Sequence, residues 1–491
     1  MLLRCAKIQL IDERDFIMAY RYGDRKQKTL FPQSIDEYIP QDAPVRAYDV
    51  IINSLDLGDL CIGCDPHKVG CPEYDPKVML KLLVYGYSYG VRSSRKLERE
   101  VNYNLSFIWL VGGLKPDHKT IAEFRRKNKT ALQKVLKQCA RLCIRLGLIE
   151  GNTLFVDGSK MRANASMKNN WTEERCRKSL KKIDKHIKDI LEECEAIDDQ
   201  EKKQQSLLKM KQELEDHEVL KSKVQNILNE LKTERKQSIN TTDPDSKSMR
   251  TRQGPGAGYN AQLTTDEKHG LIVNIDVVSD NHDYHQFSKQ VNQANEVLDK
   301  PCKTACADAG YADTNSLANA DEQGIKVIVP SQRQATKNGN SKFEKSQFKY
   351  DSRNDVYVCP EGRVLKYYSK NEKRKMRYYV AGSACQKCRY FGRCTKDKRY
   401  GRRILRLFKE DLREKLEKLY ELPSSQEIYS IRKQKVELPF GHFKRNLNTN
   451  HFLLRGLDGA KAEMSLLSGC FNITRMINII GVCSLVEKLA G

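Results

Sequence analysis

Three acidic residues have the types and settings that metal-dependent phosphodiester chemistry requires. Asp157 follows a short apolar run, Asp308 follows a run of small residues, and Glu437 lies in a basic stretch with helical spacing. Two aspartates at strand ends and one glutamate on a helix can converge on a pair of divalent cations, because hard cations prefer oxygen ligands. Two such ions bind both the attacking and the leaving oxygen of a phosphodiester. The pattern therefore predicts phosphoryl transfer, with Asp157, Asp308 and Glu437 as ligands of two Mg²⁺ or Mn²⁺ ions.

Each acid lies within a short motif: VDGSK at 156–160, DAGY at 308–311 and VELPFGHFK at 436–444. In order and content these motifs resemble those of bacterial insertion-sequence transposases of the Asp-Asp-Glu (DDE) type. The resemblance extends over nearly the whole chain, and its N-terminal part resembles an InsH-like domain. It implies an α/β fold with a ribonuclease H-like catalytic core. It also implies an enzyme that binds the ends of its insertion sequence, cleaves DNA and transfers the 3′ ends to target DNA.

The helix of the third acid resembles a further family signature, formed by Tyr429, Arg432, Glu437 and Lys444. Four residues separate Arg432 from Glu437, where three are common, so Lys433 is an alternative to Arg432. Glu437 and Lys444 have the spacing of a helix that faces a metal site and a DNA backbone. We expect Arg432, Lys444 and Arg445 to bind DNA.

The N-terminal third is expected to be helical. The cap residues Asp75, Ser93 and Asp117 predict helices that run to about residues 90, 101 and 146. Short helices with a glycine turn at 112–113 favour a helix-turn-helix-like DNA reader. The basic residues expected to face DNA are Arg92, Arg95, Arg125 and Arg126. The alternative is a helical bundle whose basic residues only face solvent.

The central part of the chain shows a series of strands and helices. Strands are predicted at 151–159, 258–265, 271–278, 304–308 and 326–330, and helices at 286–298 and 317–323. The second and third strands form a hairpin with a polar turn at 266–270. Antiparallel strands followed by alternating helices and strands fit a ribonuclease H-like core.

A long polar insertion interrupts this core. Apolar residues recur at helical spacing from Leu180 to Cys194 and again from Leu220 to Leu231, with a polar break at 198–206. This pattern predicts two helices folded into an antiparallel hairpin, and coiled-coil dimerisation between chains is the competing interpretation. Trp171 stands at the entrance to the insertion. Stacking on a DNA base is one interpretation of Trp171, and packing against the core is the other.

Sixteen cysteines in a reducing compartment are thiols or metal ligands rather than disulfides. One set has the spacing of a four-thiolate zinc site and comprises Cys359, Cys385, Cys388 and Cys394. Unligated thiols are the alternative for these four. A second and more crowded candidate cluster comprises Cys61, Cys64, His67 and Cys71.

Composition favours a polyanionic partner. The net charge is +23 with a pI near 9.3, which points to nucleic acid before a membrane. The N-terminus meets charged residues too early for a signal peptide, and Asn472, Arg475 and Asn478 interrupt the apolar C-terminal segment. We therefore expect a cytoplasmic, nucleoid-associated protein that acts on double-stranded DNA, both terminal inverted repeats and target, as a homodimer in the synaptic complex.

Five segments follow from these patterns. They are a helical DNA-binding domain at 1–147, a core at 148–170 and 240–335, a helical-hairpin insertion at 171–239, a cysteine-rich basic insertion at 336–405, and C-terminal core helices with the catalytic glutamate at 406–491.

Two other functions compete with transposition: a ribonuclease H-like nuclease without strand transfer, and a catalytically inactive DNA-binding derivative. Three further carboxylates, Asp243, Asp276 and Asp283, are the residues best able to replace a member of the triad.

Overall fold

A mixed β-sheet occupies the centre of the molecule in the computed structural model, which describes residues 34–55, 73–198, 204–251, 254–336 and 343–490. Its strands are β1 (Thr153–Arg162), β4 (Lys247–Thr251), β5 (Gly254–Asp266), β6 (Ile272–Val278), β7 (Thr304–Cys306) and β8 (Lys326–Ile328). The order is β4-β5-β1-β7-β8, and β6 pairs with β5 beside β4. β1 is antiparallel to β5 and parallel to β7, which is parallel to β8. This mixed α/β order is the predicted one and is consistent with a ribonuclease H-like core.

The predicted strands match these elements within a few residues, but no strand was predicted at β4. β4 pairs with the first residues of β5, from Lys247 opposite Gly258 to Thr251 opposite Gly254. Met249 and Thr251 are buried, and the other residues of β4 are exposed. The short length and the basic side chains hid this edge strand in the sequence.

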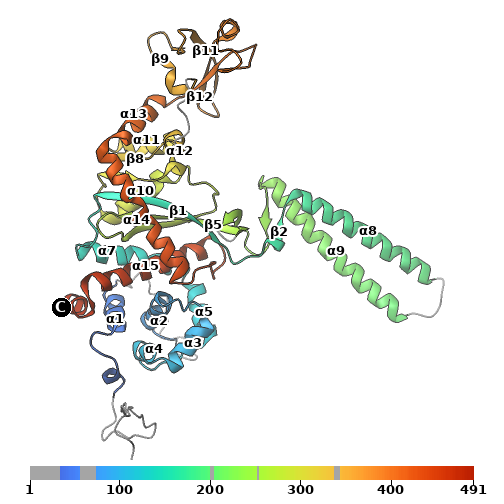
Figure 1. The fold of residues 1–491 in the computed structure, drawn as a ribbon. Coiled ribbons are helices and arrows are strands. Elements are labelled where there is room, and N and C mark those ends of the chain that lie inside the picture. The colour runs from blue at the N-terminus through green and yellow to red at the C-terminus, as the bar shows by residue number, and fades with distance from the viewer. Residues whose placement is uncertain (1–33, 56–72, 199–203, 252–253, 337–342, 491) are drawn as a thin grey trace, which may run out of the picture.

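Helices from several parts of the chain pack on the sheet (Figure 1), and their buried residues share one hydrophobic core with it. They are α7 (Val135–Arg145), α10 (Phe287–Leu298), α11 (Thr314–Glu322), α13 (Glu410–Glu421), α14 (Pro423–Arg445) and α15 (Leu457–Ile480). α15 contacts β6 and is buried along most of its length. The side chain of Asn472, fully buried on α15, accepts a hydrogen bond from the backbone N–H of Ile272 and donates to its carbonyl. This polar residue therefore joins α15 to the sheet.

The N-terminal helices share one hydrophobic core with the sheet. They are α1 (Pro44–Ser54), α2 (Pro76–Ser88), α3 (Ser94–Tyr103), α4 (Leu105–Leu110), α5 (His118–Lys127) and α6 (Lys129–Leu132). Asp75 and Asp117 cap α2 and α5 by accepting backbone N–H bonds, as expected. The helix predicted to reach residue 146 is instead three helices, α5, α6 and α7. The break comes at Asn128, whose backbone leaves the helical range.

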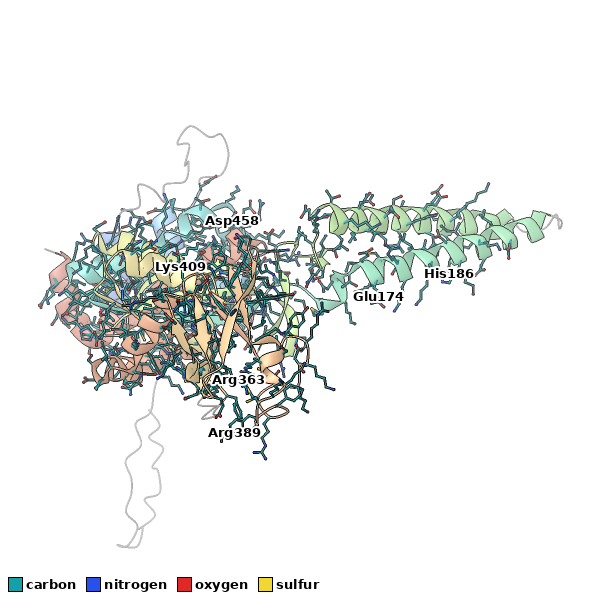
Figure 2. The ribbon with its side chains drawn as sticks, turned by 90° about the horizontal axis from the view of Figure 1, so that it is seen from above. Glu174, His186, Arg363, Arg389, Lys409 and Asp458 are labelled. Carbon is teal, nitrogen blue, oxygen red and sulfur yellow. The ribbon has the colours of Figure 1, made fainter. Side chains whose placement is uncertain are left out.

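An arm of two long helices extends from the body. α8 (Glu173–Asp198) and α9 (Gln204–Thr233) run antiparallel, and β2 (Asn170–Trp171) pairs with β3 (Ile239–Asn240) at their base (Figure 1). Figure 2 shows Glu174 and His186 on α8 along this arm, away from the body. The helical hairpin predicted from the apolar spacing is therefore present within one chain.

The cysteine-rich segment contains its own five-stranded antiparallel sheet. The strands are β9 (Lys349–Asp351), β10 (Val356–Val358), β11 (Val364–Asn371), β12 (Met376–Val380) and β13 (Arg403–Leu407), in the order β13-β12-β11-β10-β9. A separate small core packs here, formed by Phe348, Tyr357, Leu365, Tyr379 and Ile404. The cysteine-rich segment therefore holds a core of its own without a metal ion.

No single helix of the described ranges is long and apolar enough to cross a membrane. Among the described residues, one pair of helices, α15 with α16 (Val482–Ala490), is together long and apolar enough, and the two are bent by 105°.

Candidate active site

Asp157 lies within β1, two residues past the end of its parallel pairing with β7, and Asp308 lies two residues after β7. Phe155 of β1 is paired with Cys306 of β7, and each aspartate lies two residues beyond its paired residue. The carboxyl ends of neighbouring parallel strands meet at one edge of a sheet, which is where ligands bind in α/β folds. The sheet register therefore brings the two aspartates of the VDGSK and DAGY motifs to the same edge.

The Asp157 carboxyl lies in an electrostatically unusual place. Burial raises its pKa to about 7, and the carboxylates of Asp308 and Asp283 add to this increase. The guanidinium of Arg432, 3.7 Å from the nearer Asp157 oxygen, opposes it. The edge of the sheet thus gathers negative charge that a single arginine offsets only in part.

The helix α14 presents Arg432 to Asp157 and turns Glu437 to solvent. Arg432 and Val436 are buried, whereas Glu437 is exposed. Five residues at the spacing of an α-helix place Glu437 about 140° around the helix from Arg432. Two of the three predicted acids are therefore brought together, and Glu437 stays a prediction as the third.

The structure distinguishes Arg432 from its alternative, Lys433. Arg432 is buried, and its guanidinium lies 5.7 Å from the centre of the Tyr429 ring. Lys433 is exposed. Of the two, Arg432 contacts the predicted catalytic residues.

The two other DNA-binding candidates on this helix differ. The ammonium of Lys444 donates a hydrogen bond of 2.7 Å to the hydroxyl of Ser159 in the VDGSK motif. Lys444 therefore joins the end of α14 to β1, a role the sequence did not indicate. Arg445 is exposed.

Of the three rival carboxylates, only Asp283 reaches this site. The Lys160 ammonium lies 3.1 Å from an Asp283 oxygen. Asp276, on β6, forms ion pairs with Lys289 and Lys461. Asp243 is buried and accepts a hydrogen bond from the hydroxyl of Tyr259. The sequence signal for Asp283 was a polar run, NHDYH, just after a strand, and we had considered it less specific than the motifs.

Two N-terminal arginines expected to face DNA are buried. Arg92 donates to the carbonyls of Asn448 and His451 and pairs with Glu463. Arg125 donates to the hydroxyl of Tyr87 and to the carbonyl of Arg92. These two predictions are corrected, because the guanidinium groups connect the N-terminal helices to each other and to α15.

Arg95 and Arg126 are the exposed members of that predicted set. Arg126 forms two hydrogen bonds with Glu123, one turn earlier on α5. Both remain available on the surface of α3 and α5.

Trp171 is half-buried at the base of the arm. Its ring packs against the arm's small core, and the Arg175 guanidinium lies 4.6 Å from the ring centre. This is the packing alternative of the sequence analysis, and Trp171 stays only a prediction as a DNA contact.

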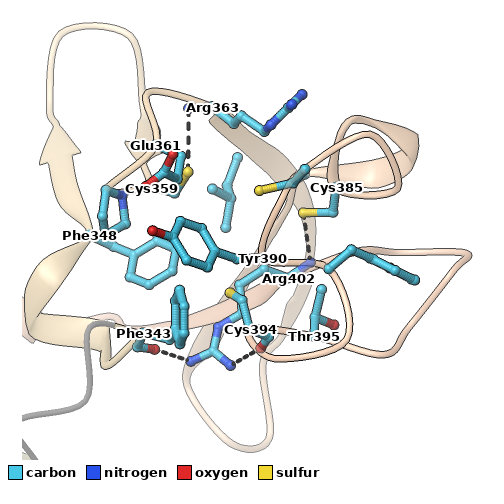
Figure 3. A pocket seen from close by; sticks show the side chains of 15 residues that line it. Phe343, Phe348, Cys359, Glu361, Arg363, Cys385, Tyr390, Cys394, Thr395 and Arg402 are labelled. Carbon is cyan, nitrogen blue, oxygen red and sulfur yellow. Dashed lines mark hydrogen bonds between the residues drawn. The ribbon is translucent and has the colours of Figure 1, made fainter.

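The four predicted zinc ligands line one small cavity in the cysteine-rich sheet (Figure 3). The backbone N–H groups of Arg363 and Arg402 donate to the sulfurs of Cys359 and Cys385, each at 3.3 Å. Across the ranges that the structure describes, no three His, Cys, Asp or Glu side chains stand in a geometry that holds a metal ion. The second candidate cluster, Cys61 to Cys71, lies outside the described residues.

Comparison with protein families gives two matches on this chain. A transposase domain model (DUF772) matches residues 33–127, and a transposase DDE domain model matches residues 358–477. The second match includes α14 with Glu437 and strands β11 to β13 of the cysteine-rich sheet, whereas Asp157 and Asp308 lie between the two matches. No curated protein matches the chain.

Among solved structures, the chain is similar to piggyBac transposase in a synaptic complex with hairpin DNA. The TM-score is 0.33 at 7% sequence identity, over 91% of this chain and 79% of that one. A likeness this low carries no argument about the site. Both matches are to transposase domains, the second of the DDE type, and the motifs around the three acids resemble those of insertion-sequence transposases of the same type.

Proposed function

We propose that this protein binds the ends of its insertion sequence, cleaves DNA there and transfers the 3′ ends to target DNA. The observation that carries the proposal is the pair of aspartates, Asp157 and Asp308, set side by side by the register of β1 and β7. They lie in motifs of the DDE family, and α14 with its predicted glutamate lies within the DDE domain match.

The donor groups at this sheet edge suit a hard divalent cation. Asp157 and Asp308 offer carboxylate oxygens partly withdrawn from water, with excess negative charge around Asp157. These two residues would hold Mg²⁺ or Mn²⁺, with two ions in the full site. When bound, such ions activate an attacking oxygen and stabilise the charge on the phosphate. Glu437, exposed on α14, would supply the third carboxylate.

The protein's own groups perform positioning and charge balance. Arg432 neutralises part of the charge on Asp157, and Lys444 holds the end of α14 against Ser159. Fixed groups of this kind lower a barrier because they need no rearrangement during the reaction. The exposed Arg95, Arg126 and Arg445 would bind phosphates of terminal-repeat and target duplexes, in a homodimeric synaptic complex at the nucleoid.

We further propose a structural zinc ion between Cys359, Cys385, Cys388 and Cys394. The support is that all four line one cavity, and that two of their sulfurs already accept backbone N–H bonds, as ligands oriented by outer groups do. Binding requires the side chains to turn toward one point.

The function is tested with the full-length protein, Mg²⁺ and a duplex carrying the terminal sequence of its element. We expect cleavage, and joining of a pre-cleaved 3′-hydroxyl end to a plasmid. Asp157→Asn or Asp308→Asn should lower both rates by roughly a thousandfold or more, because each removes several kcal/mol of charge stabilisation. Binding of the end should persist. Asp280→Asn is the matched control, since Asp280 pairs with Lys247 on the surface.

Other outcomes select the rival functions. Cleavage without joining would indicate a nuclease, and binding without either step would indicate an inactive derivative. Full activity in Asp308→Asn would remove that residue from the site, and full activity in Glu437→Gln would remove the third acid.

A further inference from the structure

A polar network connects the two aspartate motifs through the loop that follows β6. One oxygen of Asp283 accepts hydrogen bonds from Lys160 at 3.1 Å, Asn260 at 2.7 Å and Gln262 at 2.6 Å. The amide oxygen of Gln262 in turn accepts from the hydroxyl of Tyr311. Lys160 belongs to VDGSK and Tyr311 to DAGY, so Asp283 links the two motifs.

The glycine of each motif leaves the space that this arrangement needs. A Cβ at Gly158 would lie 2.3 Å from the Gln262 amide nitrogen and 2.7 Å from an Asp283 oxygen. A Cβ at Gly310 would lie 2.9 Å from an Asp308 oxygen and 3.9 Å from the other Asp283 oxygen. The first three of these separations are shorter than real Cβ atoms show. The carboxylates of Asp283 and Asp308 thus border the same glycine.

Asp308 depends on this hydrogen-bond network for its position because it lies beyond the last strand residue of β7. β7 ends at Cys306, and Asp308 begins a single 3-10 turn, Ala309–Tyr311, by accepting the backbone N–H of Gly310. The ladder that fixes Asp157 within β1 therefore stops short of Asp308. Buried Tyr311 is the next anchor along the chain, and its hydroxyl bond reaches Gln262 and, from there, Asp283.

The network also borders open space. Lys160, Asp283 and Gly310 lie on the wall of a groove of about 1180 Å³, with His282 and Tyr284 nearby. A quarter of the Asp283 side chain is exposed. The network therefore lies on the wall of an open groove rather than in the sealed core.

We propose that Asp283 is a positioning residue of the catalytic centre, holding Lys160 directly and Tyr311 through Gln262 so that Asp157 and Asp308 keep their relative placement. This inference rests on the proposed function. The negative charge matters because Lys160 is its ion-pair partner, while Asn260 and Gln262 would donate to a neutral oxygen as well.

The test compares Asp283→Asn, Lys160→Met and the double variant of the full-length protein with Mg²⁺. Cleavage of end DNA is measured at saturating DNA, with separate measurements of DNA affinity and melting temperature. We expect Asp283→Asn to lower the rate constant about 10- to 100-fold, the usual effect of losing a group that orients ligands, with affinity and melting temperature unchanged. The double variant should be no slower than the slower single variant, because both remove one link.

Asp280→Asn is again the matched control, three positions earlier in the same loop. Wild-type rates in Asp283→Asn, or strictly multiplicative losses in the double variant, would overturn the positioning role. If Asp283→Asn does not fold, Lys160→Met tests the positioning role instead. A folded Lys160→Met variant that cleaves at the wild-type rate would also overturn that role. A wild-type protein that never cleaves would instead reject the proposed function itself.

Discussion

The aspartates of β1 and of the turn after β7 form one cluster of reactive side chains, and the thiols of the cysteine-rich sheet form another, assembled by different means. Asp157 lies within β1 and Asp308 follows β7, and the pairing of Phe155 with Cys306 sets the two aspartates at one level of the sheet. The thiols lie outside the strands, with Cys359 between β10 and β11 and Cys385 in a short 3-10 turn after β12. The register of paired strands therefore fixes the level of the aspartates, whereas the loops of the cysteine-rich sheet bring the four thiols only to the lining of one cavity.

The two clusters also differ in how they balance charge. Burial and neighbouring carboxylates raise the pKa of Asp157 to about 7, so its ionised form is destabilised in the folded protein. Among the thiols, burial raises the pKa of Cys394, which favours the neutral form. Ionised Asp157 therefore opposes folding at neutral pH, whereas burial keeps the Cys394 thiol in its neutral form. Three predictions follow from this contrast.

The largest expected effect concerns stability at the aspartate edge. Because the pKa of Asp157 is raised in the folded state, wild-type stability should fall as pH rises from about 4 to about 7. Asp157→Asn removes this dependence and should raise the free energy of unfolding at pH 8 by roughly 2–4 kcal/mol. Denaturant titrations without divalent ions at pH 8 and pH 5 measure it. A gain that does not shrink at the lower pH would contradict the electrostatic cause.

The second effect concerns the single cation beside Asp157. Arg432 lowers the pKa of Asp157, so Arg432→Gln should raise that pKa further and move the acid limb of the pH–rate profile upward by about one to two units. Lys433→Gln is the matched control, because Lys433 is exposed on the same helix. A shift of equal size in the control would mean that general charge on α14, and not the contact with Asp157, sets the profile.

Sequence patterns predicted elements well where one physical cause dominates. Apolar spacing gave α8 and α9, and alternation with a polar turn gave β5 and β6. The strand-end position predicted for Asp308 is confirmed, since it follows β7, whereas the one predicted for Asp157 is wrong, because β1 continues to Arg162 through its pairing with β5. The patterns did not predict that Arg92 and Arg125 would be buried, because the local sequence around a basic residue is the same whether it faces solvent or a distant carboxylate such as Glu463.

The position of α14 illustrates a second limit. A motif gives the order of Arg432, Glu437 and Lys444 along a helix, but not the rotation of that helix about its axis. Here the buried Val436 and Phe440 set the rotation, and they turn Glu437 outward. The link from Asp283 to both motifs was also beyond sequence reasoning, since it joins residues of β1, β5 and two loops.

The smallest expected effect is on the thiol side. Purified full-length protein should carry about one tightly held zinc at the four cysteines, because four thiolates complete a tetrahedral site. Cys388→Ser should lose that zinc, while Cys483→Ser, at an exposed thiol elsewhere, should keep it. Since the sheet around Tyr357 and Tyr379 has a core of its own, zinc loss should increase proteolysis near residues 382–402 but leave β9 to β12 resistant. Metal analysis and limited proteolysis measure both. Equal zinc content in the two variants would assign the metal to other residues, and a metal-free wild type with intact resistance would make the four cysteines ordinary thiols.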